Sequence, residues 1–202
     1  MRVIAGSYRG RSLRTVPGDA TRPTTDRVKE AVASSIISRR GSIEGASVLD
    51  AFAGSGALGI EMLSRGAAHA TFVDNAKEAL QVLHANLSSV GIDPSSCVKN
   101  IDMLAASRRL PMLPGAPFDI VFLDPPYARE SEEVMGLVVA LARCGMLADH
   151  AVVVYEHKST CFDPDASQVL KGYNVPDALR DGERGAATEE EHHSPEQGSR
   201  SI

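Results

Sequence analysis

The most constraining feature of this sequence is a set of four short apolar runs that each end at an aspartate. The aspartates are Asp50, Asp74, Asp102 and Asp124, and helix-like segments separate successive runs. Strands that alternate with helices form a parallel sheet joined by right-handed crossovers. Because parallel strands end at the same edge, we expect one sheet edge to carry all four carboxylates. That edge is where ligands bind in open α/β sheets.

The pattern predicts five strands with helices between them. The strands are expected at 47–51, 70–74, 97–102, 120–123 and 151–156. Helices are expected at 58–64, 76–91 and 131–144, and a further helix should begin near Asp26 and turn Val28, Val32, Ile36 and Ile37 to one face, because apolar residues recur there at spacings of three and four. Together these elements predict a three-layer α/β/α sandwich with a mostly parallel sheet.

Positive charge is concentrated near the amino terminus of a chain that is acidic elsewhere. Residues 1–40 hold nine basic and three acidic residues, a local charge of +6, whereas the whole chain has a formal charge of -5 and the rest therefore carries -11. Short strands at 3–5 and 12–16 predict a β-hairpin that carries Arg9, Arg11 and Arg14. Such patches usually contact phosphates, so we expect a polyanion here, with a solvated structural hairpin as the alternative.

A glycine loop, Asp50 to Gly59, provides the first half of a candidate site. Gly54, Gly56 and Gly59 have the spacing of a dinucleotide fingerprint, and glycine allows a ligand to lie against bare backbone. A carboxylate at Asp50 would repel a pyrophosphate but would suit the ammonium and sulfonium charges of S-adenosylmethionine. Asp74, about 20 residues on, stands where an acid accepts ribose hydroxyls. Either aspartate could instead cap a helix.

The third aspartate, Asp102, could accept a hydrogen bond from an adenine amino group, with Ile101 or Met103 against the ring. A solvated loop aspartate is the alternative at this position.

The second half of the site is Asp124-Pro125-Pro126-Tyr127, at the end of the fourth strand. An exocyclic amine on a base is a poor nucleophile because its lone pair is delocalised into the ring. A carboxylate and the Pro125 carbonyl could each accept one amine hydrogen and hold the nitrogen toward a methyl donor. Tyr127 would stack on the base, and the prolines would stiffen the loop. A chance turn after a core strand is the alternative.

Several segments together resemble known families. DAFAGSGALGIE, FVD and FLDPPY look like the class I S-adenosylmethionine-dependent amino-methyltransferases. RVIAGSYRGRSL and RPTTDRVKEAV are similar to the bacterial 16S ribosomal RNA guanine-N2 methyltransferase family that modifies guanine 966, and the similarity covers residues 1–158. This resemblance implies a Rossmann-like fold and methyl transfer from S-adenosylmethionine to 16S RNA or the assembled small subunit, by a cytoplasmic monomer without a metal.

The resemblance and the residue patterns define three groups of candidate site residues. Catalysis is expected at Asp124, Pro125, Pro126 and Tyr127. Cofactor contacts are expected at Asp50, Phe52, Ala53, Gly54, Gly56, Asp74, Asn75, Asp102, Met103 and Asp124. RNA contacts are expected at Arg9, Arg11, Arg14, Arg22, Thr25 and Arg27.

The remaining expectations concern domain limits and other functions. We expect a basic hairpin at 1–18, a methyltransferase domain at 19–180 with a possible sixth strand at 168–175, and a polar, disordered tail at 181–202 that includes His192 and His193. Three cysteines without zinc-ligand spacing indicate no metal site, and the absence of a long apolar run indicates no membrane span. Methyl transfer to DNA or protein glutamine, and RNA binding without catalysis, are the alternatives.

Overall fold

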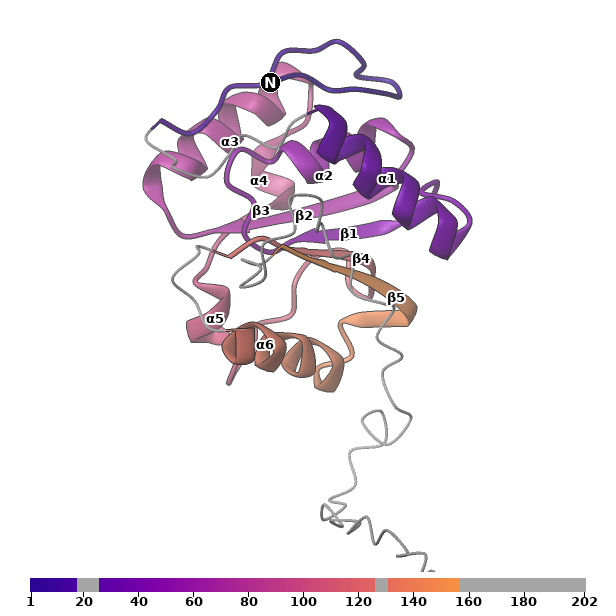
Figure 1. Cartoon of the computed structure of the whole chain (residues 1–202). Coiled ribbons are helices and arrows are strands. Elements are labelled where there is room, and N and C mark those ends of the chain that lie inside the picture. Colours follow the sequence, from indigo (N-terminus) through magenta and orange to yellow (C-terminus); the bar gives the residue numbers. More distant parts are fainter. Residues whose placement is uncertain (18–25, 126–130, 157–202) are drawn as a thin grey trace, which may run out of the picture.

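The computed structural model describes residues 1–17, 26–125 and 131–156, in which helices and strands alternate. The elements are α1 (Asp26–Arg40), β1 (Ser47–Asp50), α2 (Ala57–Ser64), β2 (His69–Asp74), α3 (Lys77–Ser89), α4 (Pro94–Cys97), β3 (Val98–Asn100), α5 (Met103–Ala106), β4 (Phe118–Leu123), α6 (Ser131–Arg143) and β5 (Leu147–Tyr155). Figure 1 shows the sheet between two helical layers, with α1, α2 and α3 on one face and α5 and α6 on the other. The predicted three-layer sandwich is confirmed.

The five strands pair in parallel, in the order β3-β2-β1-β4-β5. Asp50 is opposite Phe72 on β2 and Phe122 on β4. Asp74 therefore lies two residues further along β2, and Asp124 lies two residues beyond Phe122, just past the end of β4. Asp74 in turn is opposite Asn100, two residues before Asp102. The register therefore brings all four aspartates to one carboxyl edge, as the sequence predicts.

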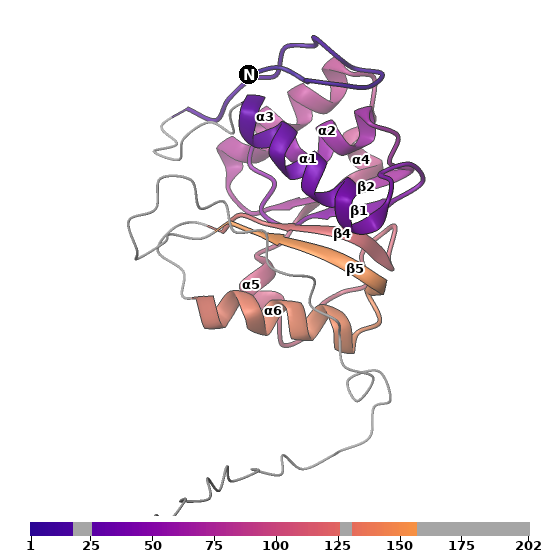
Figure 2. The same ribbon diagram turned by 45° about the vertical axis from the view of Figure 1, so that its right-hand side comes forward.

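The central strands are buried on both faces, so the sheet separates two hydrophobic cores. On β4, Ile120 and Phe122 pack into the core beneath α1, α2 and α3, whereas Val121 and Leu123 pack into the core beneath α6. Strand β1 divides Val48 and Leu49 between the two cores in the same way. Figure 2 shows the same two layers from a second direction. This double burial explains why the strands are continuous apolar runs.

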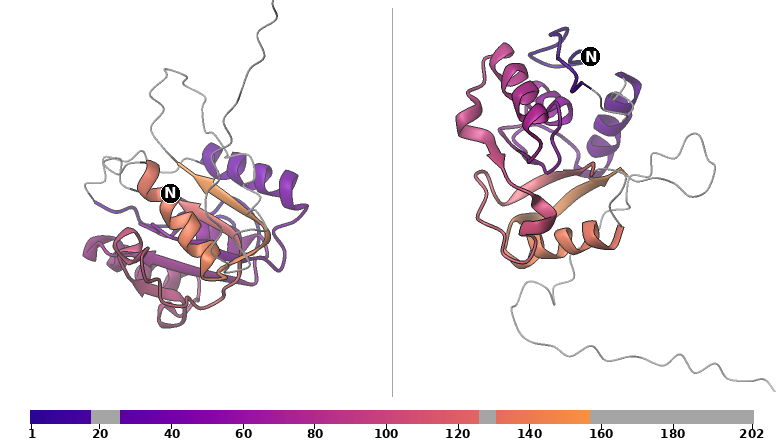
Figure 3. Two further views of the ribbon diagram at one scale, coloured as in Figure 1. Left: turned by 90° about the horizontal axis from the view of Figure 1, so that it is seen from below. Right: turned by 90° about the vertical axis from the view of Figure 1, so that its left-hand side faces the viewer.

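Residues 1–17, here called the amino-terminal arm, lie over the outer side of the layer that contains α2 and α3 (Figure 3, right). The expected strands at 3–5 and 12–16 are wrong in extent, because the arm has a single isolated antiparallel bridge between Arg2 and Ser12. The backbone N–H groups of Ile4, Ala5 and Tyr8 bond to α2 side chains instead of to the opposite side of the hairpin. Backbone bonds still join Met1 and Val3 to the segment 10–13, and docking on α2 takes the place of strand pairing from Ile4 onward.

The third strand is shorter than its expected range of 97–102. Cys97 ends α4, which begins at Pro94 and is capped by the Asp93 carboxylate. Asp102 caps the next short helix, α5, rather than ending the strand. At both ends of β3, hydrogen bonds from backbone N–H groups to a nearby aspartate side chain therefore form a short helix in place of further strand pairing.

Helix α1 buries the expected face except at Ile37, and it adds Lys29 to that face. Ile37 is 43% exposed, whereas Lys29 is fully buried beside Val32 and Ile36. The Lys29 ammonium donates to the carbonyl of Arg2 and lies 3.7 Å from Asp26 Oδ1. Burial lowers the pKa of Lys29, so this residue contributes to anchoring the arm and not to its exposed positive charge.

Several sequence predictions fall outside the described residues. They concern Arg22, Thr25, Pro126, Tyr127, the possible strand at 168–175, and the tail at 181–202 with His192 and His193. Within the ranges that the structure describes, none of the helices has the length and apolar character needed to cross a membrane.

Candidate functional site

The glycine loop follows β1 and leads into α2, and its glycines serve two different purposes. Gly54 and Gly56 both have positive φ, 52° and 77°. A Cβ on Gly56 would lie 2.4 Å from Leu83 Cδ1, so packing requires glycine there. A Cβ on Gly54 would meet nothing within 4 Å. Gly54 therefore presents bare backbone to open space, as a ligand lying against the loop requires.

Asp50 lies beneath this loop and is only 3% exposed. Its Oδ2 accepts a hydrogen bond from the backbone N–H of Gly59 at 3.1 Å, which fixes the first turn of α2. Burial raises the pKa of Asp50 to about 7; the Gly59 bond opposes this shift and the charge of Asp74 adds to it. A nearby cationic group would stabilise the ionised form of this carboxyl group.

Asp74 joins the glycine loop to the start of α3. Its Oδ2 accepts from the backbone N–H of Gly54, and its Oδ1 accepts from that of Ala76, both at 2.8 Å. An ionised carboxylate has about four acceptor positions, so two hydroxyl groups could still bind. Asp74 is partly exposed and Asn75 is exposed, which keeps both accessible. The expected ribose contact is compatible with this geometry.

The loop begins between two strand ends, which brings the two halves of the candidate site together. The N–H of Ala51 donates to the carbonyl of Phe122 on β4, and the N–H of Ala53 donates to the carbonyl of Val73 on β2. Asp124 lies two residues beyond Phe122 and is half-buried, and Pro125 is buried. Phe52, between the two bonded alanines, is half-buried as well.

The adenine-binding candidates are arranged differently from the expectation. Asp102 Oδ1 accepts from the N–H groups of Leu104 and Ala105, at 3.1 and 3.0 Å, as a helix cap. Met103 is 1% exposed and packs into the core beneath α6, whereas Ile101 is half-buried. Ile101 is thus the better placed of the two apolar candidates.

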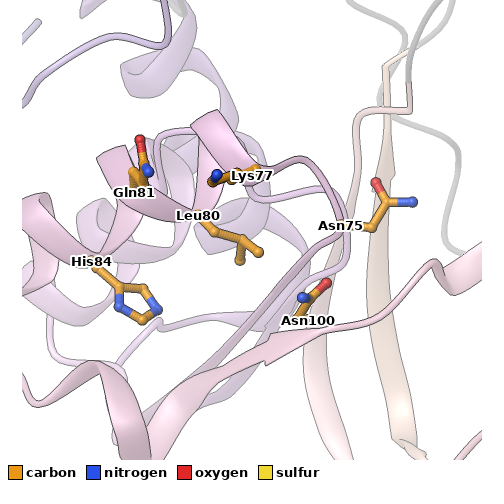
Figure 4. A pocket seen from close by; sticks show the side chains of 6 residues that line it. All are labelled: Asn75, Lys77, Leu80, Gln81, His84 and Asn100. Carbon is orange, nitrogen blue, oxygen red and sulfur yellow. The ribbon is translucent and has the colours of Figure 1, made fainter.

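A hollow of about 380 Å³ lies on the outer side of α3, beside the edge strand β3 (Figure 4). Its lining residues are Asn75, Lys77, Leu80, Gln81, His84 and Asn100. Among the predicted cofactor residues, Asn75 is the one that lines it. The hollow therefore adjoins the carboxyl edge but is not centred on the glycine loop or on Asp124.

The candidate RNA-binding side chains that the structure describes are exposed. Arg9, Arg11 and Arg14 lie on the arm, and Arg27 lies in the first turn of α1. The described residues contain no cluster of three or more His, Cys, Asp or Glu side chains that could hold a metal ion.

The polar residues that hold the arm were not singled out from the sequence. Glu61, Ser64 and Asn86 are all buried, and each bonds to arm backbone. The available signal was a polar side chain within the apolar face of a helix. Such a residue needs a partner once it is buried.

Comparison with known proteins identifies the family. Residues 1–174 match the family model described as conserved hypothetical protein 95. The chain is 40% identical to YlbH of Bacillus subtilis over 161 residues, covering 78% of this chain and 82% of that protein. It is 38% identical to ribosomal RNA small subunit methyltransferase D of Escherichia coli K12, covering 77% and 74%.

A solved structure leads to the same family. The Escherichia coli protein yhhF superposes with a TM-score of 0.64 at 37% identity, covering 79% of this chain and 81% of that one. The chain therefore belongs to the conserved hypothetical protein 95 family and is a class I methyltransferase related to ribosomal RNA small subunit methyltransferase D.

Proposed function

We propose that this protein transfers a methyl group from S-adenosylmethionine to the exocyclic N2 amine of a guanine in 16S ribosomal RNA, with guanine 966 as the expected position. The observation that carries the proposal is the shared carboxyl edge, where Asp50, Asp74 and Asp124 lie beside the glycine loop. The ribosomal RNA methyltransferase named among its relatives supports the substrate class.

The residues of the loop fit the cofactor. Gly54 leaves space against bare backbone, and Asp74 retains acceptor capacity for ribose hydroxyls. Asp50 is a buried carboxyl group, and a positive charge nearby would stabilise its ionised form. S-adenosylmethionine, when bound, supplies an electrophilic methyl group on a positively charged sulfur.

Asp124 and Pro125 would prepare the amine for attack. The carboxylate of Asp124 and the carbonyl of Pro125 each accept one amine hydrogen, which holds the nitrogen in place and favours its pyramidal, more nucleophilic form. The backbone before them is fixed, because Leu123 is buried and its carbonyl accepts from the N–H of Glu156 at 2.9 Å. Stacking of Tyr127 on the base remains a prediction from the sequence.

The arm supplies the electrostatic part of RNA binding. Arg9, Arg11 and Arg14 are exposed on a segment whose backbone is bonded to α2 and α3. Arginines on an anchored backbone lose less backbone freedom on binding than arginines on a mobile loop. The positive charge of these arginines would hold RNA against the layer of α1, α2 and α3, in which α2 follows the glycine loop.

Substitution of Asp124 tests the catalytic part of the proposal. Asp124→Ala should bind S-adenosylmethionine with an unchanged dissociation constant and should lose most methyl transfer, roughly a hundredfold or more for a group that orients and polarises the nucleophile. Asp124→Asn keeps one acceptor oxygen and should fall between the two. Turnover of Asp124→Ala at the wild-type rate would remove Asp124 from the mechanism.

A further inference from the structure

Asn86 connects the arm to the glycine loop through a buried side chain. It lies on α3 and is 1% exposed, in line with the buried apolar residues Leu83 and Leu87. Its Oδ1 accepts from the N–H of Arg14 at 2.8 Å, and its Nδ2 donates to the carbonyl of Arg14 at 3.0 Å. Its Nδ2 also donates to the carbonyl of Ser55 at 2.8 Å. Both amide hydrogens and the amide oxygen are therefore in use.

The loop end of this connection is the part of the candidate site that a cofactor would contact. Ser55 lies between Gly54, which presents open backbone, and Gly56, which packs against Leu83 of the same helix. Gly54 is bonded in turn to Asp74. A movement of the loop would thus pull on the Asn86 amide, and through it on the backbone of Arg14.

The arm end is a separate attachment from the one on α2. The first half of the arm is held by Glu61, which accepts from the N–H groups of Ile4 and Ala5 at 2.8 and 3.1 Å, and by Ser64, which accepts from that of Tyr8 at 2.9 Å. Those contacts do not involve the glycine loop. Loss of the Asn86 side chain should therefore leave the arm docked on α2 while it breaks the connection between Arg14 and Ser55. A further contact between arm and loop, from Ser55 Oγ to Met1 Sδ at 3.8 Å, uses a weak thioether acceptor.

We propose that Asn86 is a positioning residue that couples RNA binding on the arm to cofactor binding on the glycine loop. The proposal rests on the proposed function. Each ligand restricts the motion of one of the two segments that bond to the Asn86 side chain. The ligand that binds first therefore reduces the conformational entropy that is lost when the second ligand binds. The coupling is reciprocal, because linkage requires each ligand to change the affinity of the other by the same factor.

The test measures the dissociation constant of S-adenosylhomocysteine, which permits no turnover, with and without saturating small ribosomal subunits that lack the modification. Wild-type protein should bind it at least about fivefold more tightly with subunits present, the lower end of typical coupling. Asn86→Ala and the nearly isosteric Asn86→Asp, which loses both donations, should bring this ratio close to one. Ser64→Ala is the control, because it weakens the arm's other attachment without contact to Ser55.

A second readout needs no RNA. Cofactor binding should slow amide hydrogen exchange at residues 13–15 of the wild-type arm and should leave it unchanged in Asn86→Asp. Equal ratios in wild-type and Asn86 variants, or equal protection of the arm, would overturn the coupling while leaving the methyltransferase proposal intact. Failure of the wild-type protein to bind subunits at all would overturn the proposed function itself, and the coupling with it.

Discussion

Asp50→Asn gives the most detailed prediction about the candidate site. Burial raises the pKa of Asp50 from the ordinary 3.8 to about 7. The folded state therefore holds this proton more tightly than the unfolded state does. The stability that depends on this group is fully present below about pH 4 and is lost as the pH rises through about 7.

The expected size of the effect follows from the same pKa difference. Each pKa unit corresponds to about 1.4 kcal/mol, so the wild-type protein should lose about 3 kcal/mol of unfolding free energy relative to Asp50→Asn between pH 5 and pH 8. Asparagine keeps an oxygen that can accept from the N–H of Gly59 but does not titrate. Urea unfolding of both proteins at several pH values measures the difference.

The affinity for the cofactor should change with pH in the direction opposite to the stability. A sulfonium or ammonium group near Asp50 stabilises the ionised carboxylate, so wild-type affinity for S-adenosylmethionine should rise between pH 6 and pH 8, with proton release on binding below about pH 7. Asp50→Asn should be more stable than wild type at pH 8 and bind the cofactor less tightly. A pH-independent stability difference between the two proteins would refute the reasoning from burial.

Three further perturbations test the arm. Gly6→Ala should release the arm from α2, seen as faster amide exchange, because its Cβ would lie 1.6 Å from the Ser64 carbonyl oxygen; the matched Gly10→Ala has a similar φ and open space, and should cost only about 1 kcal/mol of backbone strain. Glu61→Gln should lower the free energy of unfolding by about 2 kcal/mol in urea, since it removes a charge-assisted hydrogen bond to Arg65, which keeps its ion pair with Glu30. Replacing all three arm arginines with serine should reduce the salt dependence of RNA binding by about 2 in log–log slope, whereas a matched triple variant on the opposite layer should not. The arm residues are Arg9, Arg11 and Arg14, and the matched residues are the exposed Arg108, Arg109 and Arg143.

The sheet and its carboxyl edge could be predicted from the sequence because each buried strand is a continuous apolar run. Ile120 to Leu123 must be buried on both faces, and Pro125 and Pro126 cannot continue the ladder. Such constraints act locally and need no knowledge of the partner strand. The same holds for the positive φ of Gly54 and Gly56, which the loop requires.

The attachment of the arm could not be predicted, because it depends on partners far away in the sequence. The N–H groups of Ile4 and Ala5 donate to Glu61 and not to the opposite side of the hairpin, and no feature of the neighbouring sequence predicts this partner. The sequence places Lys29 among the basic residues of the amino terminus and does not indicate its burial, because a lysine is almost never fully buried without an acceptor. The carbonyl of Arg2 provides that acceptor only in the folded arm.

The central claim is methyl transfer to a guanine of 16S ribosomal RNA, and the most direct test is transfer of a tritiated methyl group. Labelled S-adenosylmethionine would be incubated with small ribosomal subunits that lack the modification, and the labelled nucleotide would then be mapped. We predict label on the N2 amine of one guanine, with Asp124→Ala giving background incorporation. Label on DNA, on protein glutamine or on another position of the base, or no incorporation by a protein that binds both ligands, would contradict the account.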